Sequence, residues 1–199
     1  DEASITLEGV IEDIDIQLPN ATTTIQCKYH DDSKFTMSSV AAPILEMVCH
    51  YNECVALGKS THYILYAHYS ENIEEFDTAA FEKHISTTTS KELQLSYFHK
   101  IYTIPDTTIL ALANKPKKSK TDKEKILNYY SSNKSVLSIC VDWSKFWECF
   151  TYEQAEDFEE LKEKVIQKLC EQTDRKTAEE LYYPNAFSMV ANISAKKDA

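Results

Sequence analysis

The sequence predicts an α/β fold in which a mixed β-sheet is flanked by helices and followed by a mainly helical C-terminal annex. Residues 8–16 and 24–30 both alternate apolar and polar side chains, the pattern of half-buried strands. Residues 39–57 follow with apolar side chains at helical spacing, and residues 62–69 form an apolar run typical of a buried strand. The predicted order is therefore strand, strand, helix, strand.

The 39–57 helix is expected to turn one apolar face inward, formed by Val40, Ile44, Met47, Val48, Tyr51, Cys54 and Val55. Ser38 or Ser39 is expected to cap this helix, and Pro43 is compatible with it only near its first turn. Gly58 is expected to end it.

A short link joins the first two predicted strands. Residues 18–22 include Pro19 and Asn20, which favour a turn, so the strands are expected to form a hairpin. Residues two apart on a strand share a face. Asp13 and Asp15 are therefore predicted on one face of the first strand, with isoleucines on the other.

The second strand of the hairpin also carries polar residues on one face. Gln26, Lys28 and His30 are two apart and share a side, opposite Ile25 and Cys27. If the polar faces of both strands coincide, two carboxylates lie beside an amide and an ammonium group. That arrangement is the layout of a metal-dependent phosphodiesterase.

Phosphodiester hydrolysis requires such groups. A hard cation neutralises the developing charge and lowers the pKa of the attacking water. Mg²⁺ prefers oxygen ligands and takes one or two carboxylates together with waters. A lysine beside the metal can orient or deprotonate the water and offset phosphate charge.

The acidic residue on one strand and the Gln26-x-Lys28 of the next resemble the PD-(D/E)xK restriction-endonuclease superfamily, in its Mrr-like form with Gln in place of the acid. The wider sequence at residues 5–8, 12–16 and 25–29 resembles the nuclease domains of bacterial anti-phage effectors. These are the double-strand DNA endonucleases of CBASS and Lamassu systems, some of them fused to STAND-type NTPases. The resemblance implies a restriction-endonuclease-like sheet core.

The likeness is specific over about the first seventy residues and looser at residues 61–69 and 182–186. The family usually has a helix before the first strand, whereas this chain starts at Asp1, almost at the strand, so an upstream piece is expected outside this numbering. Asp13 and Asp15 match the family aspartate about equally well, and both are retained as candidates.

The resemblance implies roles for the hairpin residues. Mg²⁺ or Mn²⁺ is expected on Asp13, Asp15, Gln26 and the backbone carbonyl of Cys27, while Lys28 positions or activates the water. The catalytic residues are then Asp13, Asp15, Gln26 and Lys28, and the accessory candidates are Glu8 and His30.

The expected function is a Mg²⁺-dependent endonuclease domain acting on double-stranded DNA, in an anti-phage effector of the bacterial cytoplasm. Activation is expected through homo-oligomerisation, or through a sensor domain or partner subunit. Two alternatives remain: a catalytically inactive nuclease-like module for DNA binding or assembly, and an RNA-cleaving toxin. A simpler interpretation of the hairpin, that its acidic residues form an ordinary solvated strand face, also remains open.

The net charge of −11 is unfavourable for binding DNA phosphates. The lysines, however, crowd into residues 115–125, and the candidates for phosphate contact are Lys115, Lys117, Lys118 and Lys120. The alternative, which is favoured, is that this stretch is a solvated loop around Pro116.

The length of 199 residues suits one domain, with a nuclease core at residues 1–72 and an annex at 73–199 that packs on it. No apolar run is long enough for a membrane span, and no signal peptide is visible. The six cysteines lack zinc-site spacing, which predicts free thiols in a reducing cytoplasm.

The annex is predicted to be mixed. Helices are expected at 76–85, 121–130, 151–170 and 177–183, a strand at 135–141, and a strand or a helix at 91–103. Thr151 and Gln154 form a capping-box signature for the 151–170 helix. The residues of this helix expected to face inward are Phe158, Leu161, Val165 and Leu169. An aromatic group at residues 143–150 is interpreted as core packing rather than as a base-stacking surface.

Overall fold

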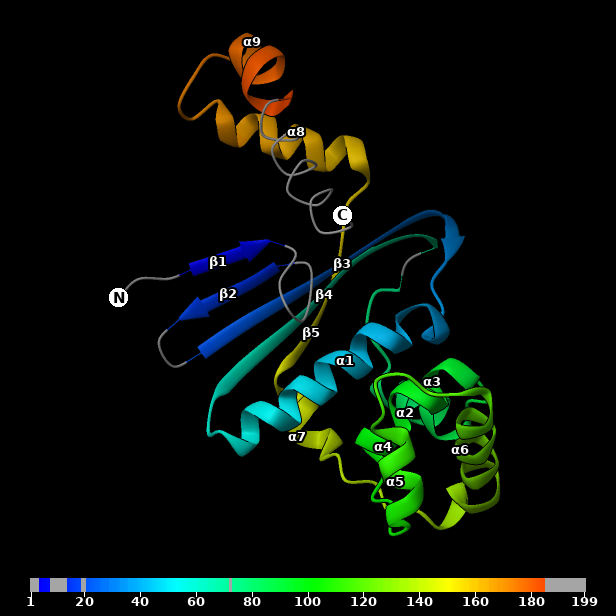
Figure 1. Cartoon of the computed structure of the whole chain (residues 1–199). Helices are drawn as coiled ribbons and strands as arrows, with labels where there is room; N and C mark the ends of the chain where they lie inside the picture. Colours follow the sequence, from blue (N-terminus) through cyan, green and yellow to red (C-terminus); the bar gives the residue numbers. More distant parts are fainter. Residues whose placement is uncertain (1–3, 8–13, 19–20, 72, 185–199) are drawn as a thin grey trace.

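The computed structural model describes residues 4–7, 14–18, 21–71 and 73–184. Its centre is a mixed five-stranded sheet in the order β1-β2-β3-β4-β5 (Figure 1). Strands β1 to β3 are antiparallel neighbours, whereas β3, β4 and β5 run parallel. The strands are β1 (Ser4–Leu7), β2 (Ile14–Leu18), β3 (Ala21–Lys34), β4 (Ser60–Glu71) and β5 (Phe150–Gln154). The predicted α/β class is therefore confirmed.

The predicted hairpin forms between β2 and β3. Leu18 pairs with Ala21, so the strands are joined by a two-residue connection, and Ile14 pairs with Ile25. The first predicted strand is described from Ile14 onward, and its part at residues 8–13 lies outside the described residues.

The long helix α1 (Met37–Ala56) connects β3 to β4. The predicted cap at Ser38 or Ser39 is wrong, because the helix begins two residues earlier and Thr36 caps it. The Thr36 hydroxyl accepts the Ser39 backbone N–H (3.2 Å). Pro43 consequently lies in the second turn instead of the first.

Gly58 ends α1, as predicted. Its φ of +66° is left-handed, which glycine adopts without a steric penalty. The Gly58 N–H donates to the Val55 carbonyl (3.1 Å), and the Lys59 N–H donates to Cys54 (2.9 Å). These two hydrogen bonds are those of a Schellman motif.

The core lies between α1 and one face of the sheet. On β4 every second residue, Tyr63, Leu65, Ala67 and Tyr69, is almost completely buried. The predicted inward face of α1 is confirmed except at Val55, which is 55% exposed. Helix α1 therefore covers the face of the sheet to which this β4 series belongs.

Six shorter helices follow β4 and enlarge the core beyond α1 (Figure 1). They are α2 (Thr78–Thr87), α3 (Lys91–Ser96), α4 (Phe98–Ile101), α5 (Thr107–Ala113), α6 (Lys120–Asn133) and α7 (Trp143–Glu148). Residues 91–103 are thus mainly helical, which settles the open alternative. The strand predicted at 135–141 is wrong: a 3₁₀ turn, η1 (Lys134–Val136), is followed only by an isolated bridge between Tyr102 and Ile139.

The aromatic group around α7 packs in the core, as predicted. Phe146 is fully buried, with its ring 5.7 Å from Tyr51 and 5.7 Å from Tyr63. Trp147 Nε1 donates a hydrogen bond to Glu82 (2.8 Å), which satisfies the indole N–H.

The helix predicted from Thr151 starts too early. Thr151 belongs to β5 and pairs with Ile64 of β4, because the parallel ladder outweighs a local capping signal. The helix α8 (Phe158–Leu169) begins after Asp157, whose carboxylate accepts the Glu160 N–H (2.9 Å).

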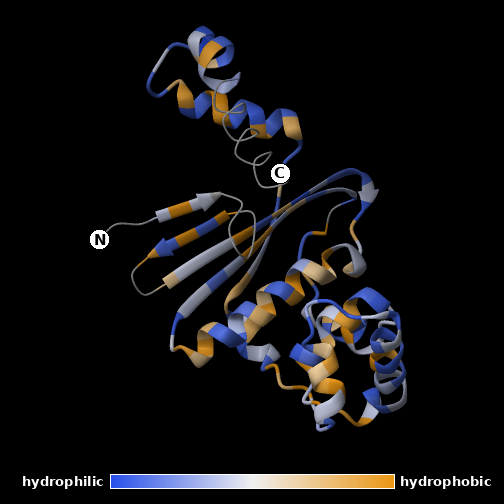
Figure 2. Ribbon diagram, in the orientation of Figure 1, coloured by the Kyte–Doolittle hydropathy of each residue, from blue (hydrophilic) through white to orange (hydrophobic). Residues whose placement is uncertain are grey.

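The end of the described chain is helical, as predicted, in α9 (Arg175–Thr177) and the π-helical turn η2 (Ala178–Tyr182). Figure 2 shows hydrophobic and hydrophilic residues alternating along α8. Two predicted inward residues of α8 are instead exposed, Phe158 at 48% and Val165 at 44%. In the described part of the chain, no helix combines the length and the apolar character that a bilayer span requires.

Candidate functional site

The pairing of β2 with β3 brings the predicted polar faces together. Asp15 pairs with Thr24, and Ile14 pairs with Ile25. Directly paired residues share a face, and alternation along β3 adds Gln26 and Lys28 to the face of Thr24. The predicted coincidence of faces is therefore confirmed for Asp15, Gln26 and Lys28, which we call the polar face.

Part of this polar face is buried. Asp15 is 4% exposed, Thr24 is completely buried, and Gln26 is 7% exposed. Thr24 and Gln26 pair on β4 with Tyr63 and Leu65, which belong to the core side of the sheet. The polar face thus turns toward α1, and the solvated-face interpretation is wrong for Asp15.

Two oxygen atoms at the Asp15–Thr24 pair, Asp15 Oδ1 and Thr24 Oγ1, are buried and have no hydrogen-bond partner among the described residues. Burying such a group unsatisfied costs about 1–3 kcal/mol, and more for a charged one. A pair of unsatisfied oxygens on adjacent strands is chemically suited to a cation or to an added hydrogen-bond donor.

His50 of α1 lies close enough to Asp15 to sense its charge. Burial lowers the pKa of His50, and the negative charge of Asp15 opposes that shift. Both ring nitrogens are engaged, Nδ1 with the Tyr63 hydroxyl (2.8 Å) and Nε2 with the Cys54 thiol (3.2 Å). The proximity of His50 to Asp15 depends on the packing of α1 against the sheet, which no local sequence signal specifies.

Gln26 contacts the backbone group that was expected to bind metal. Its Nε2 donates to the Cys27 carbonyl at 3.3 Å.

Lys28 is half-buried and pairs with Ala67 of β4. Among the residues that the structure describes, no carboxylate forms an ion pair with its ammonium group. Lys28 lies four residues beyond Thr24, or about 13 Å along the strand at 3.3 Å per residue. Gln26 stands midway between the level of Asp15 and that of Lys28.

Of the remaining candidates for the site, the structure describes His30 but not Asp13 or Glu8. His30 shares the face of Gln26 and Lys28, is exposed, and has its ring 5.3 Å from that of Tyr69. Asp13 and Glu8 lie outside the described residues.

The donor set on the polar face is compatible with a hard cation, though incomplete in the described chain. The Asp15 carboxylate and the Gln26 amide offer oxygen atoms, the ligand type that Mg²⁺ and Mn²⁺ prefer. Within residues 4–7, 14–18, 21–71 and 73–184, no group of three or more His, Cys, Asp or Glu residues is placed to hold a metal ion.

The lysine candidates lie apart from this face, in the loop between α5 and α6 and at the start of α6 (Figure 1). Lys115 Nζ lies 3.3 Å from the Asp122 carboxylate. Lys118 Nζ donates to the Lys115 carbonyl (3.0 Å). Lys117 and Lys120 are exposed.

Comparison of the chain with protein-family models, curated proteins and solved structures finds no match.

Proposed function

We propose that the chain is a metal-dependent DNA endonuclease domain with a restriction-endonuclease-like core. The observation that carries this proposal is the β2–β3 pairing, which sets the buried Asp15 carboxylate on the same face as Gln26 and Lys28. The order β2, β3, α1, β4 also agrees with the order that the PD-(D/E)xK resemblance implies.

The proposed roles follow from the chemistry of each group. Asp13, Asp15 and Gln26 would hold Mg²⁺ or Mn²⁺, together with the backbone carbonyl of Cys27. The bound ion would supply charge neutralisation and a more acidic water. Lys28, which has no carboxylate partner in the described chain, is available to orient or deprotonate that water.

The distance between Asp15 and Lys28 limits how closely Asp15 could approach a metal beside Lys28. Asp15 pairs with Thr24. Along β3, Thr24 precedes Gln26 by two residues and Lys28 by four. We therefore propose a supporting position for Asp15 if the metal lies near Lys28, and Asp13, which lies outside the described residues, is kept as a candidate ligand. His30 and Glu8 remain accessory candidates.

The same proposal places the protein in the bacterial cytoplasm as an anti-phage effector acting on double-stranded DNA. Its six cysteines are free thiols, which agrees with a reducing compartment. Unregulated cleavage would damage the host genome. We therefore propose control through a homo-oligomer, a sensor domain or a partner subunit.

The decisive experiment is plasmid cleavage by Lys28→Ala with Mg²⁺ or Mn²⁺. Cleavage should be abolished while the melting temperature stays nearly unchanged, because Lys28 makes no ion pair with the described residues. Lys34→Ala provides a matched control: it lies on the same strand, is exposed and pairs with Glu71, so cleavage should persist. Full cleavage by Lys28→Ala would refute the assignment.

A second candidate is a nuclease-like module that binds DNA or assembles without cutting. Two observations favour it: glutamine stands where an acid is usual, and no three-residue metal group exists among the described residues. Calorimetric titration with Mn²⁺ separates the two proposals. The nuclease should bind the ion and lose that binding in Asp13→Asn, whereas a scaffold should bind none.

A further inference from the structure

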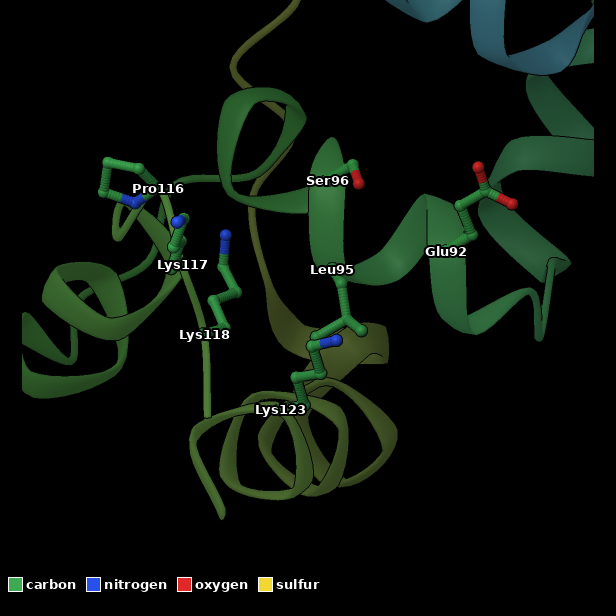
Figure 3. A pocket seen from close by; sticks show the side chains of 7 residues that line it. All are labelled: Glu92, Leu95, Ser96, Pro116, Lys117, Lys118 and Lys123. Atoms are coloured by element: carbon green, nitrogen blue, oxygen red, sulfur yellow. The ribbon is translucent and has the colours of Figure 1, made fainter. Parts of the chain in front are cut away.

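A second candidate site lies far along the chain from the polar face, in a hollow of about 530 Å³ between α3 and the start of α6 (Figure 3). Pockets for small ligands typically measure about 300–1,000 Å³, so the size suits a molecule as large as a nucleotide. The loop that carries Pro116 forms part of its wall.

The hollow concentrates positive charge on a protein whose net charge is −11. Lys117, Lys118 and Lys123 all line it. None of the three forms an ion pair with a carboxylate of the described chain, whereas the neighbouring Lys115 is paired with Asp122. Ammonium groups gathered without counter-charges are suited to a phosphate-bearing ligand.

Two further features support a formed site. Lys118 is partly buried, and its hydrogen bond to the Lys115 carbonyl holds the ammonium group in place. The positive charge of the lysines also acts on His99. Burial, together with the charges of Lys100 and Lys118, lowers the pKa of His99 to about 4.

The rest of the lining differs from the lysine side. Leu95 and Pro116 contribute apolar surface, while Glu92 contributes a carboxylate. Figure 3 shows Glu92 on the opposite side of Leu95 and Ser96 from Lys117 and Lys118. A carboxylate repels phosphate but accepts hydrogen bonds from a hydroxyl or amino group.

We propose that this hollow binds a small phosphate-bearing ligand of the nucleotide class. The lysines hold the phosphates, Leu95 and Pro116 contact the base or sugar, and Glu92 accepts from a hydroxyl or amino group. This site does not depend on the proposed nuclease activity. It favours a free nucleotide over a DNA backbone, because a continuous row of phosphates would bring one against Glu92.

The test is isothermal titration of the whole chain in about 0.15 M salt, at which surface charges are largely screened. The probes are ADP, inorganic pyrophosphate, adenosine and a short DNA duplex. ADP and pyrophosphate should bind, and adenosine should not. The double variant Lys117→Gln/Lys118→Gln should weaken ADP binding about tenfold or more, since a charge-assisted hydrogen bond contributes about 1.5–3 kcal/mol.

Matched variants complete the design. Lys125→Gln removes the same charge from an exposed position of α6 that does not line the hollow, and it should leave ADP binding unchanged. Glu92→Gln should weaken ADP binding but not pyrophosphate binding. Absence of ADP binding at millimolar concentration, or an equal loss in Lys125→Gln, would overturn the proposal. So would duplex binding that is lost in the double variant while ADP fails to bind.

Discussion

Asp15 and Thr24 face each other across β2 and β3, and each buries a side-chain oxygen with no hydrogen-bond partner in the described part of the chain. The pair lies beneath α1, where His50 senses the charge of Asp15. Folded proteins rarely leave such groups unsatisfied, and those that persist are often associated with function. A buried polar group that stays unsatisfied at this position would lower the stability of the fold.

The first prediction concerns the charge of Asp15. In EDTA, Asp15→Asn should raise the free energy of unfolding by about 1 kcal/mol, because the amide keeps the shape and removes a charge that is costly to bury. Adding Mn²⁺ should raise the melting temperature of the unmodified protein more than that of Asp15→Asn.

Asp32→Asn is the control for this experiment. It removes the same charge from an exposed position of β3 and should change neither quantity. A loss of stability in Asp15→Asn in EDTA would show that the carboxylate is already satisfied in the folded protein.

The second prediction concerns the end of α1. Gly58→Ala should lower the free energy of unfolding by about 1 kcal/mol, because an alanine at φ +66° is strained. None of the described residues lies within 4 Å of the added Cβ, so the expected cost comes from the backbone. Urea denaturation measures it, and Gly58→Asn should lose less, since asparagine tolerates this conformation. An unchanged midpoint for Gly58→Ala would contradict the assigned cap.

The third prediction concerns acid stability. His99 has a pKa of about 4 in the folded protein against 6.5 ordinarily, mainly because of burial. The unfolded chain binds the proton more readily than the folded protein does. The contribution of His99 to the free energy of unfolding is therefore fully present above pH 6.5 and is lost as the pH falls toward 4. His50, whose pKa is also lowered, acts with the same sign.

The contribution of His99 can be isolated with His99→Gln. The variant should lose less of its stability between pH 6.5 and pH 4 in urea denaturation than the unmodified protein does. Identical pH profiles for the two proteins would exclude the assigned role of His99.

The fourth prediction separates core packing from surface aromatics. Phe146→Ala should cost about 3–5 kcal/mol, because the ring is fully buried between Tyr51 and Tyr63. Phe158→Ala, whose ring is 48% exposed on α8, should change stability by only about 0.5 kcal/mol. Similar losses for both variants in chemical denaturation would place Phe158 in a core as well.

Several features could be predicted from local sequence. The alternation along residues 24–30 placed Gln26 and Lys28 on one side of β3, because side-chain direction in a strand follows from the period of two. Gly58 marked the end of α1 because only a few residue types tolerate its backbone conformation. Thr151 was misassigned because a capping signature is local, whereas its pairing with Ile64 joins residues far apart in the chain.

The sequence by itself determined which residues of the hairpin share a face, and where α1 stops. Only the tertiary structure decided that the face of Asp15 and Gln26 lies beneath α1, while Ile14 and Ile25 on the other side are only half-buried. Alternation along a strand fixes two faces without saying which is covered, since burial depends on where a distant helix packs. The nearness of His50 to Asp15 was decided in the same way.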